Sequence, residues 1–116
     1  MTIAKVSLDC KNIRDWESFH SEFAQVFGFP AFYGRNMDAW IDCMTSLDAP
    51  DDGMSNVHCE PGKVLTLELA NVASFAVRCP AQYKALIECA AFVNWRRLEV
   101  GSPSVLALSF WYTRES

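Results

Sequence analysis

Three apolar stretches rich in leucine and β-branched residues predict the β-strands of this chain. They cover residues 2–8, 63–69 and 104–112, and turn-forming residues separate them from the rest of the sequence. The middle stretch has few polar breaks, which is typical of a strand covered on both faces. A sheet of three strands therefore needs helices or loops as cover.

The segment after the first strand carries apolar residues at helical spacing. We expect a helix here, with Asp15 as its N-cap and Phe27 near its end. Gly28 is the expected C-terminal stop, and Pro30 prevents the helix from restarting.

Three further helical segments follow. One is expected from Asn36, a good N-cap residue, to about Ser46. After the middle strand, residues 71–78 suggest a short helix, and Pro80 opens a longer one to about Arg97. The residues expected to face inward are Met37, Trp40, Ile41 and Met44 in the second helix, and Tyr83, Leu86, Ile87, Ala90 and Val93 in the last.

Strands that alternate with helices predict βαβ crossovers and a parallel sheet. The expected fold class is α/β, a small three-stranded parallel sheet with packed helices, and residues 1–116 are expected to form one domain. Residues 48–62 break the pattern, since Asp, Gly, Pro, Ser and Asn dominate there. We expect an exposed loop, long for a compact domain.

Composition narrows the class of protein. No apolar run approaches the roughly 20 residues that span a bilayer, and the first residues do not resemble a signal peptide, so we expect a cytoplasmic protein that is monomeric when free. Five scattered cysteines without a CxxC pair indicate reduced, mostly buried thiols. No basic patch is present, which disfavours nucleic-acid binding.

The negative charge is concentrated in one window. Residues 36–62 contain six acidic residues and no Lys or Arg, a formal charge of −6 in a chain whose net charge is −4. Such a field favours a cationic partner and speeds its approach. The acidic residues of this window are Asp38, Asp42, Asp48, Asp51, Asp52 and Glu60.

Two of these acids lie on the second predicted helix. Asp38 and Asp42 are four positions apart, so their carboxylates share one side of the helix. Like charges at this spacing repel by roughly 0.2–0.5 kcal/mol on an isolated helix. The helix dipole favours Asp38 in the first turn and does little for Asp42. Asp42 is therefore a candidate for a role other than folding, although a solvated helix face is the simpler alternative.

Catalysis is the rival hypothesis. His20 or His58 could activate Cys43 or Cys59 as a nucleophile, but no recognisable local signature surrounds any of them. His20 is expected at the boundary of the first helix's apolar face, and Cys43 on the inward face of the second. The spacing around His58 and Cys59 does not suit structural zinc. We expect no enzyme activity, metal or cofactor.

The stretch from Phe29 to Cys43 resembles the signature of the barstar family of ribonuclease inhibitors. The matching pattern is Phe-Pro-x-Phe-Tyr-Gly-x-Asn-x-Asp-Ala-x-x-Asp-Cys, and the order of predicted elements agrees along most of the chain. The resemblance implies the same small parallel sheet with packed helices. It also makes the loop at 48–62 an insertion relative to the family pattern.

The resemblance implies a site as well. The position of Asp42 would enter the ribonuclease active site, where its carboxylate replaces a substrate phosphate among basic side chains, and Asp38 would add a second pair. Asn36 and Gly34 would shape the loop before the helix. The full set of partner-binding residues expected on this basis is Phe32, Tyr33, Gly34, Asn36, Met37, Asp38, Ile41, Asp42 and Thr45.

The chain also departs from the family pattern. Phe32 stands where the family often has tyrosine, Arg35 where an acidic residue is known, and Ile41 where an aromatic is usual, with Trp40 expected inside. The family's last helix supplies a further acidic contact, for which Glu88 and Asn94 remain alternatives. Residues 95–97, Trp-Arg-Arg, could form a second contact patch, but cations are common at helix C-termini.

These observations predict an inhibitor, an immunity protein, that blocks a basic ribonuclease toxin with helix-borne aspartates. A second hypothesis keeps the binding mode and changes the partner to a toxin that is not a ribonuclease or to another cationic protein. A small Cys/His enzyme is the third.

Overall fold

The computed structural model describes residues 2–112. Within this range three strands form one parallel sheet in the order β1-β2-β3, with β1 at Lys5–Asp9, β2 at Leu65–Ala70 and β3 at Leu106–Phe110. Lys5 pairs with Thr66, and Leu65 with Leu106. The prediction of an α/β fold with a three-stranded parallel sheet is confirmed, although each strand is shorter than the apolar stretch that predicted it.

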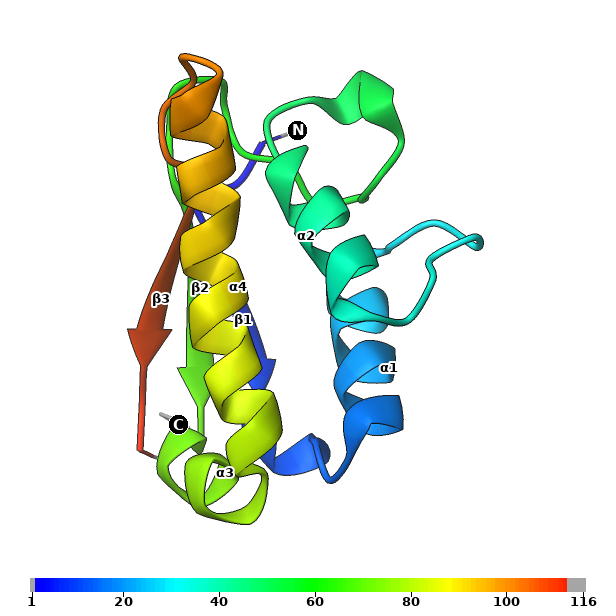
Figure 1. Cartoon of the computed structure of the whole chain (residues 1–116), viewed down its shortest axis with the longest axis vertical. Helices are drawn as coiled ribbons and strands as arrows, with labels where there is room; N and C mark the ends of the chain where they lie inside the picture. The colour runs from blue at the N-terminus through cyan, green and yellow to red at the C-terminus, as the bar shows by residue number, and fades with distance from the viewer. Residues whose placement is uncertain (1, 113–116) are drawn as a thin grey trace.

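The helices connect these strands in the predicted order (Figure 1). They are α1 (Trp16–Phe27), α2 (Met37–Thr45), α3 (Val72–Arg78) and α4 (Pro80–Glu99), with short 3-10 turns η1 (Cys10–Asn12) and η2 (Pro50–Asp52). None of the helices formed by residues 2–112 combines the length and the apolar composition needed to cross a membrane.

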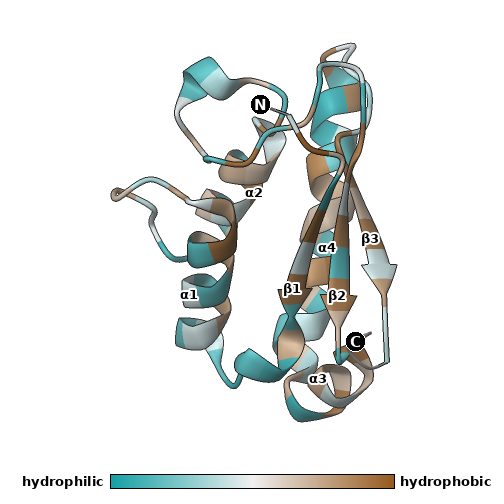
Figure 2. Cartoon of the chain, turned by 180° about the vertical axis from the view of Figure 1, so that it is seen from behind, coloured by the Kyte–Doolittle hydropathy of each residue, from teal (hydrophilic) through white to brown (hydrophobic). Residues whose placement is uncertain are grey.

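The sheet has helices on one face only, which corrects the expectation that both faces are covered. In β2, Leu65, Leu67 and Leu69 are buried, while Thr66 and Glu68 on the opposite face are partly exposed. From behind, the strands lie in front of α4 (Figure 2). Because successive strands are added in one direction, right-handed crossovers bring both connections to the same face.

The open face of the sheet is polar. Ser7 donates a hydrogen bond of 3.0 Å to the Glu68 carboxylate, and Lys5 lies 3.6 Å from the same group. Polar residues therefore alternate with the buried ones on β1 and β2. This alternation is usual in antiparallel sheets with one face in water, and here it occurs in a parallel sheet.

The hydrophobic core lies between the covered face of the sheet and the helices. Its largest fully buried side chains include Trp40, Phe19, Phe23, Phe27 and Phe75. Trp40 packs edge-on against Phe23 with ring centroids 5.6 Å apart. The inward face predicted for α2 is confirmed. In α4, however, Ile87 is an exposed residue rather than an inward one.

Local signals set the ends of α1 as predicted. The Asp15 side chain accepts a hydrogen bond from the Ser18 backbone N–H at 2.8 Å, and Ser18 closes a capping box by accepting from the Asp15 N–H at 3.0 Å. Gly28 ends the helix in the left-handed conformation, at φ 66°.

The long loop at residues 48–62 is packed against the fold rather than simply exposed. The Asn56 backbone N–H and the Ser55 hydroxyl both donate to the carbonyl of Phe27, at 2.8 and 3.2 Å. Ser55 and Cys59 are buried. The prediction of an exposed loop was therefore wrong for the centre of this segment, which caps the last turn of α1.

Candidate functional site

Asn36 positions the start of α2. Its side-chain oxygen accepts a hydrogen bond from the Ala39 N–H at 2.8 Å, and its amide nitrogen donates to the Gly34 carbonyl at 3.2 Å. A Cβ at Gly34 would lie 3.3 Å from that amide nitrogen and 3.4 Å from the Ala39 Cβ. Gly34 and Asn36 therefore shape the turn into α2, as expected, without themselves offering a large contact surface.

Arg35 fixes the preceding loop to α1. It adopts the left-handed backbone conformation at φ 54°, which costs a non-glycine residue about 1–2 kcal/mol. Its Nη2 donates to the Glu17 carbonyl at 2.9 Å and to the Ser21 hydroxyl at 2.8 Å. Arg35, which departs from the family pattern, thus hydrogen-bonds to α1 with its positively charged side chain.

Tyr33 is a second anchor of this loop. Its hydroxyl lies 2.6 Å from Nδ1 of His20, and both side chains sit in a cluster of aromatic rings. Burial lowers the pKa of His20, and the Arg35 charge lowers it further. His20 is only 4% exposed, so it lies within the buried face of α1 and not at the boundary of that face as expected. Tyr33 contributes mainly by holding the loop in place.

The expected apolar contact residues differ in their access to solvent. Phe32 projects from the loop with 75% of its surface exposed, and Met37 is half-buried. Ile41 is only 8% exposed and belongs to the core. Thr45 is half-buried, and its hydroxyl donates to the Ile41 carbonyl at 2.6 Å. Phe32 and Met37 can offer contact area, whereas Ile41 offers little.

Asp38 and Asp42 both lie at the surface of α2. The Asp38 carboxylate makes no hydrogen bond or ion pair with any residue from 2 to 112. Asp42 accepts a hydrogen bond at Oδ1 from Nη1 of Arg96 on α4, at 2.8 Å, and its side chain remains 56% exposed. The two carboxylates are therefore accessible, and one of them already has a cationic neighbour.

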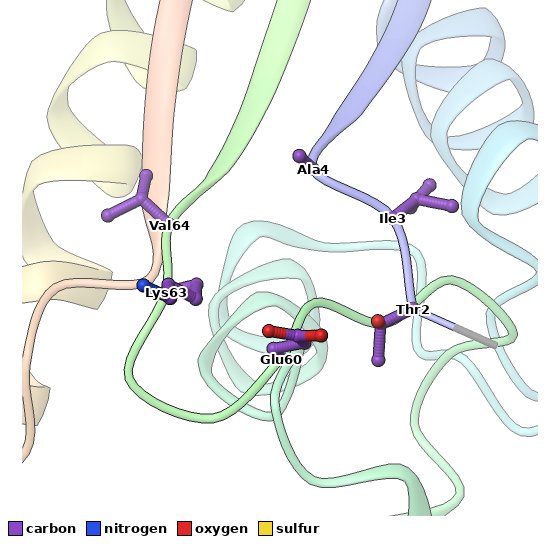
Figure 3. A pocket seen from close by; sticks show the side chains of 6 residues that line it. All are labelled: Thr2, Ile3, Ala4, Glu60, Lys63 and Val64. Carbon is purple, nitrogen blue, oxygen red and sulfur yellow. The ribbon is translucent and has the colours of Figure 1, made fainter.

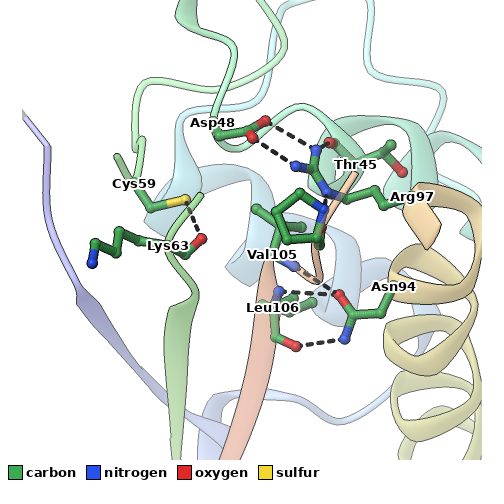
Figure 4. A network of polar contacts seen from close by, with 9 residues as sticks. Thr45, Asp48, Cys59, Lys63, Asn94, Arg97, Val105 and Leu106 are labelled. Carbon is green, nitrogen blue, oxygen red and sulfur yellow. Dashed lines mark hydrogen bonds and ion pairs between the residues drawn. The ribbon is translucent and has the colours of Figure 1, made fainter. Parts of the chain in front are cut away.

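A third acid of the window, Asp48, has a structural role. It forms a two-pronged ion pair with Arg97, with distances of 2.6 and 3.0 Å, and both side chains are largely buried (Figure 4). Arg97 also donates to the carbonyls of Thr45 and Pro103, at 2.9 and 2.7 Å. This arginine ties the C-terminal end of α2 to α4.

The two residues of α4 left open as a further polar contact have different surroundings. Asn94 exchanges hydrogen bonds of 2.8–3.2 Å with the backbone of Val105 and Leu106, so it holds the start of β3 (Figure 4). Glu88 is exposed. Both Glu88 and Asp38 raise the pKa of the Cys89 thiol, after the larger effect of burial. Of the two alternatives, Glu88 therefore has the exposed carboxylate, while Asn94 is engaged with the backbone of β3.

Two hollows open near the loop at residues 48–62. One, of about 420 Å³, separates the segments that lead into β1 and β2 and is lined by Thr2, Ile3, Ala4, Glu60, Lys63 and Val64 (Figure 3). The other, of about 390 Å³, lies between α2 and the loop and is lined by Asp42, Thr45, Ser46, Asp52, Met54 and Arg96. The second hollow extends the α2 surface towards the loop.

The two cysteines considered as nucleophiles, Cys43 and Cys59, are both buried. Burial raises the pKa of the Cys43 thiol to about 11, and the nearby Asp42 carboxylate acts in the same direction. The pKa of Cys59 is also raised, chiefly by burial. The thiolate, which is the reactive form, is thus scarce at neutral pH. Among residues 2–112, no group of three potential metal ligands comes together.

Comparison with known proteins places the chain in a family. Residues 3–106 match the family described as "Barstar (barnase inhibitor)". A Bacillus subtilis (strain 168) protein named "Putative ribonuclease inhibitor YrdF" is 36% identical over 47 residues, which are 40% of this chain and 52% of that relative. The chain thus spans about half the length of the curated relative it matches. With the match extending over nearly all of its sequence, this chain belongs to the barstar family.

Proposed function

We propose that this protein inhibits a basic ribonuclease by covering its active site with α2 and the loop before it. In this mechanism Asp38 and Asp42 occupy positions of substrate phosphates and pair with the enzyme's cationic side chains. Phe32 and Met37 add contact area around them. No bond is made or broken, so the protein acts by occupancy and not by turnover.

The observation that carries this proposal is the accessibility of Asp38 and Asp42 on a rigidly held helix. The α2 N-terminus is capped by Asn36, and its C-terminal end is tied by Arg97. A helix fixed at both ends presents its carboxylates without a large loss of conformational entropy on binding. Charge-assisted bonds to arginine in a desolvated site are among the strong polar contacts.

Inhibition of barnase, measured as the inhibition constant for RNA cleavage, tests the proposal. Asp42→Ala should raise this constant at least tenfold, while the urea midpoint of unfolding changes little because the carboxylate is exposed. Glu60→Ala is the matched control, since it removes one exposed acid of the same window away from α2. An Asp42→Ala variant that inhibits as tightly as wild type would refute the assignment of the site.

A barstar-like module directed at a cationic protein other than a ribonuclease is the second candidate. The departures from the family pattern at Arg35 and Ile41 favour it, because Arg35 is bonded to α1 and Ile41 lies in the core, so neither supplies the contact that the family pattern has there. In this case the protein would leave RNA cleavage by barnase unaffected and bind another basic protein with an association rate that falls as salt increases.

A further inference from the structure

Arg96 and Arg97 are neighbours in sequence with opposite surroundings. Arg97 is 7% exposed and joins α2, α4 and the segment before β3. The Arg96 side chain is 40% exposed, and its one hydrogen bond among residues 2–112 goes to Oδ1 of Asp42. The structural work at this end of α4 is thus done by Arg97. Arg96 is not required for it.

The Arg96 guanidinium lies where a partner would approach. Arg96 and Asp42 line the same hollow between α2 and the loop, together with Asp52. A two-pronged contact from a partner's arginine uses one acceptor position on each oxygen of the Asp42 carboxylate. Nη1 of Arg96 already donates to Oδ1 at 2.8 Å, and it places a guanidinium charge against the carboxylate that a partner's cation would bind.

We propose that Arg96 is a specificity-determining residue, which competes with the partner's cation for the carboxylate of Asp42. A partner's arginine must either share this carboxylate with the Arg96 guanidinium, against the repulsion of like charges, or displace it. Arg96 therefore lowers affinity for any protein that offers only positive charge. This inference rests on the proposed function, because it takes Asp42 as a contact of the basic partner.

The test uses barnase as the probe. A double-mutant cycle measures the effect of Arg96→Gln in two backgrounds, the wild type and the Asp42→Asn variant. Arg96→Gln should lower the inhibition constant about two- to fivefold at low salt, the range expected for freeing one exposed ion pair. Lys11→Gln, which removes an exposed positive charge at η1, is the matched control and should change the constant by less. The urea midpoint of Arg96→Gln should stay within error of wild type.

The same substitution made in the Asp42→Asn variant separates competition from general charge. If Arg96 competes for the carboxylate, the gain from Arg96→Gln should shrink once that carboxylate is gone. An equal gain in both backgrounds would mean that Arg96 acts only through its charge, and the proposal would be overturned. So would an inhibition constant that Arg96→Gln leaves unchanged or raises. If no version inhibits barnase, the proposed function fails first and the inference with it.

Discussion

Replacing Arg97 with methionine should be among the most damaging single changes at the end of α4. Methionine keeps much of the length of the buried side chain and removes the guanidinium. The change breaks the hydrogen bonds to Asp48, to the Thr45 carbonyl and to the Pro103 carbonyl. The Asp48 carboxylate would be left in a largely buried position without the guanidinium that pairs with it.

The expected cost follows from that unpaired charge. Removing one partner of a buried ion pair destabilises a protein by roughly 3–5 kcal/mol. A total stability of about 5–15 kcal/mol is usual for a domain, so Arg97→Met should remove a large fraction of it. With a urea m-value of about 2 kcal/mol per M, the midpoint of unfolding should fall by about 1.5–2.5 M.

Urea unfolding followed by circular dichroism, under reducing conditions because the cysteines are free, measures this shift. The double variant Arg97→Met/Asp48→Leu removes the charge left behind and should recover a substantial part of the loss. Arg96→Gln, one residue away but exposed, should move the midpoint little. A midpoint of Arg97→Met within 0.5 M (about 1 kcal/mol at this m-value) of wild type would refute the reasoning.

Three further predictions concern the segments that position α2. Asn36→Ala removes the N-cap bond and should lower the free energy of unfolding by about 1 kcal/mol, measured in urea. Gly28→Ala should cost at least about 1 kcal/mol from its positive φ. A further steric part comes from the Asn56 side chain, whose Nδ2 would lie 2.6 Å from the added Cβ, and Asn56→Ala should relieve only some of it because the Asn56 Cβ, at 2.8 Å, remains. Folding lowers the pKa of His20, so near the ordinary pKa of histidine the unfolded chain binds a proton that the folded chain does not bind. The free energy of unfolding should therefore fall as the pH drops from about 7 through 6.5. His20→Gln should make the free energy of unfolding less dependent on pH in this range. An unchanged dependence would contradict the lowered pKa of His20.

The parts of the fold that sequence predicted well are those set by local chemistry. Asp15, Gly28 and Asn36 each act on a helix end within three residues, so their roles could be read from neighbouring positions. Helical periodicity likewise placed Trp40 inside. The contacts with a partner are not set by local chemistry alone, because they depend on a second molecule.

Other features depended on residues far apart in the chain. The pairs of Arg96 with Asp42 and of Arg97 with Asp48 join positions about 50 residues apart, and nothing near residue 96 distinguishes one arginine from the other. Ile41 shows a different limit, since helical spacing predicted it to face inward while the family resemblance placed it in the contact set, and the structure buries it. The open face of the sheet had a signal, the alternation of Thr66 and Glu68 with leucines, but it was outweighed by the apolar character of the stretch.

The hydrogen bonds of Arg97 to Thr45, Asp48 and Pro103 affect when the α2 surface can form during synthesis. The end of α2 is held by a residue near the end of α4, and Asn94 and Arg97 are in turn bonded to the segment at 103–106. A nascent chain that has emerged only as far as α2 lacks all of these partners. All of α4 and the start of β3 must therefore have emerged from the ribosome before a nascent copy can present Asp38 and Asp42 in their final arrangement.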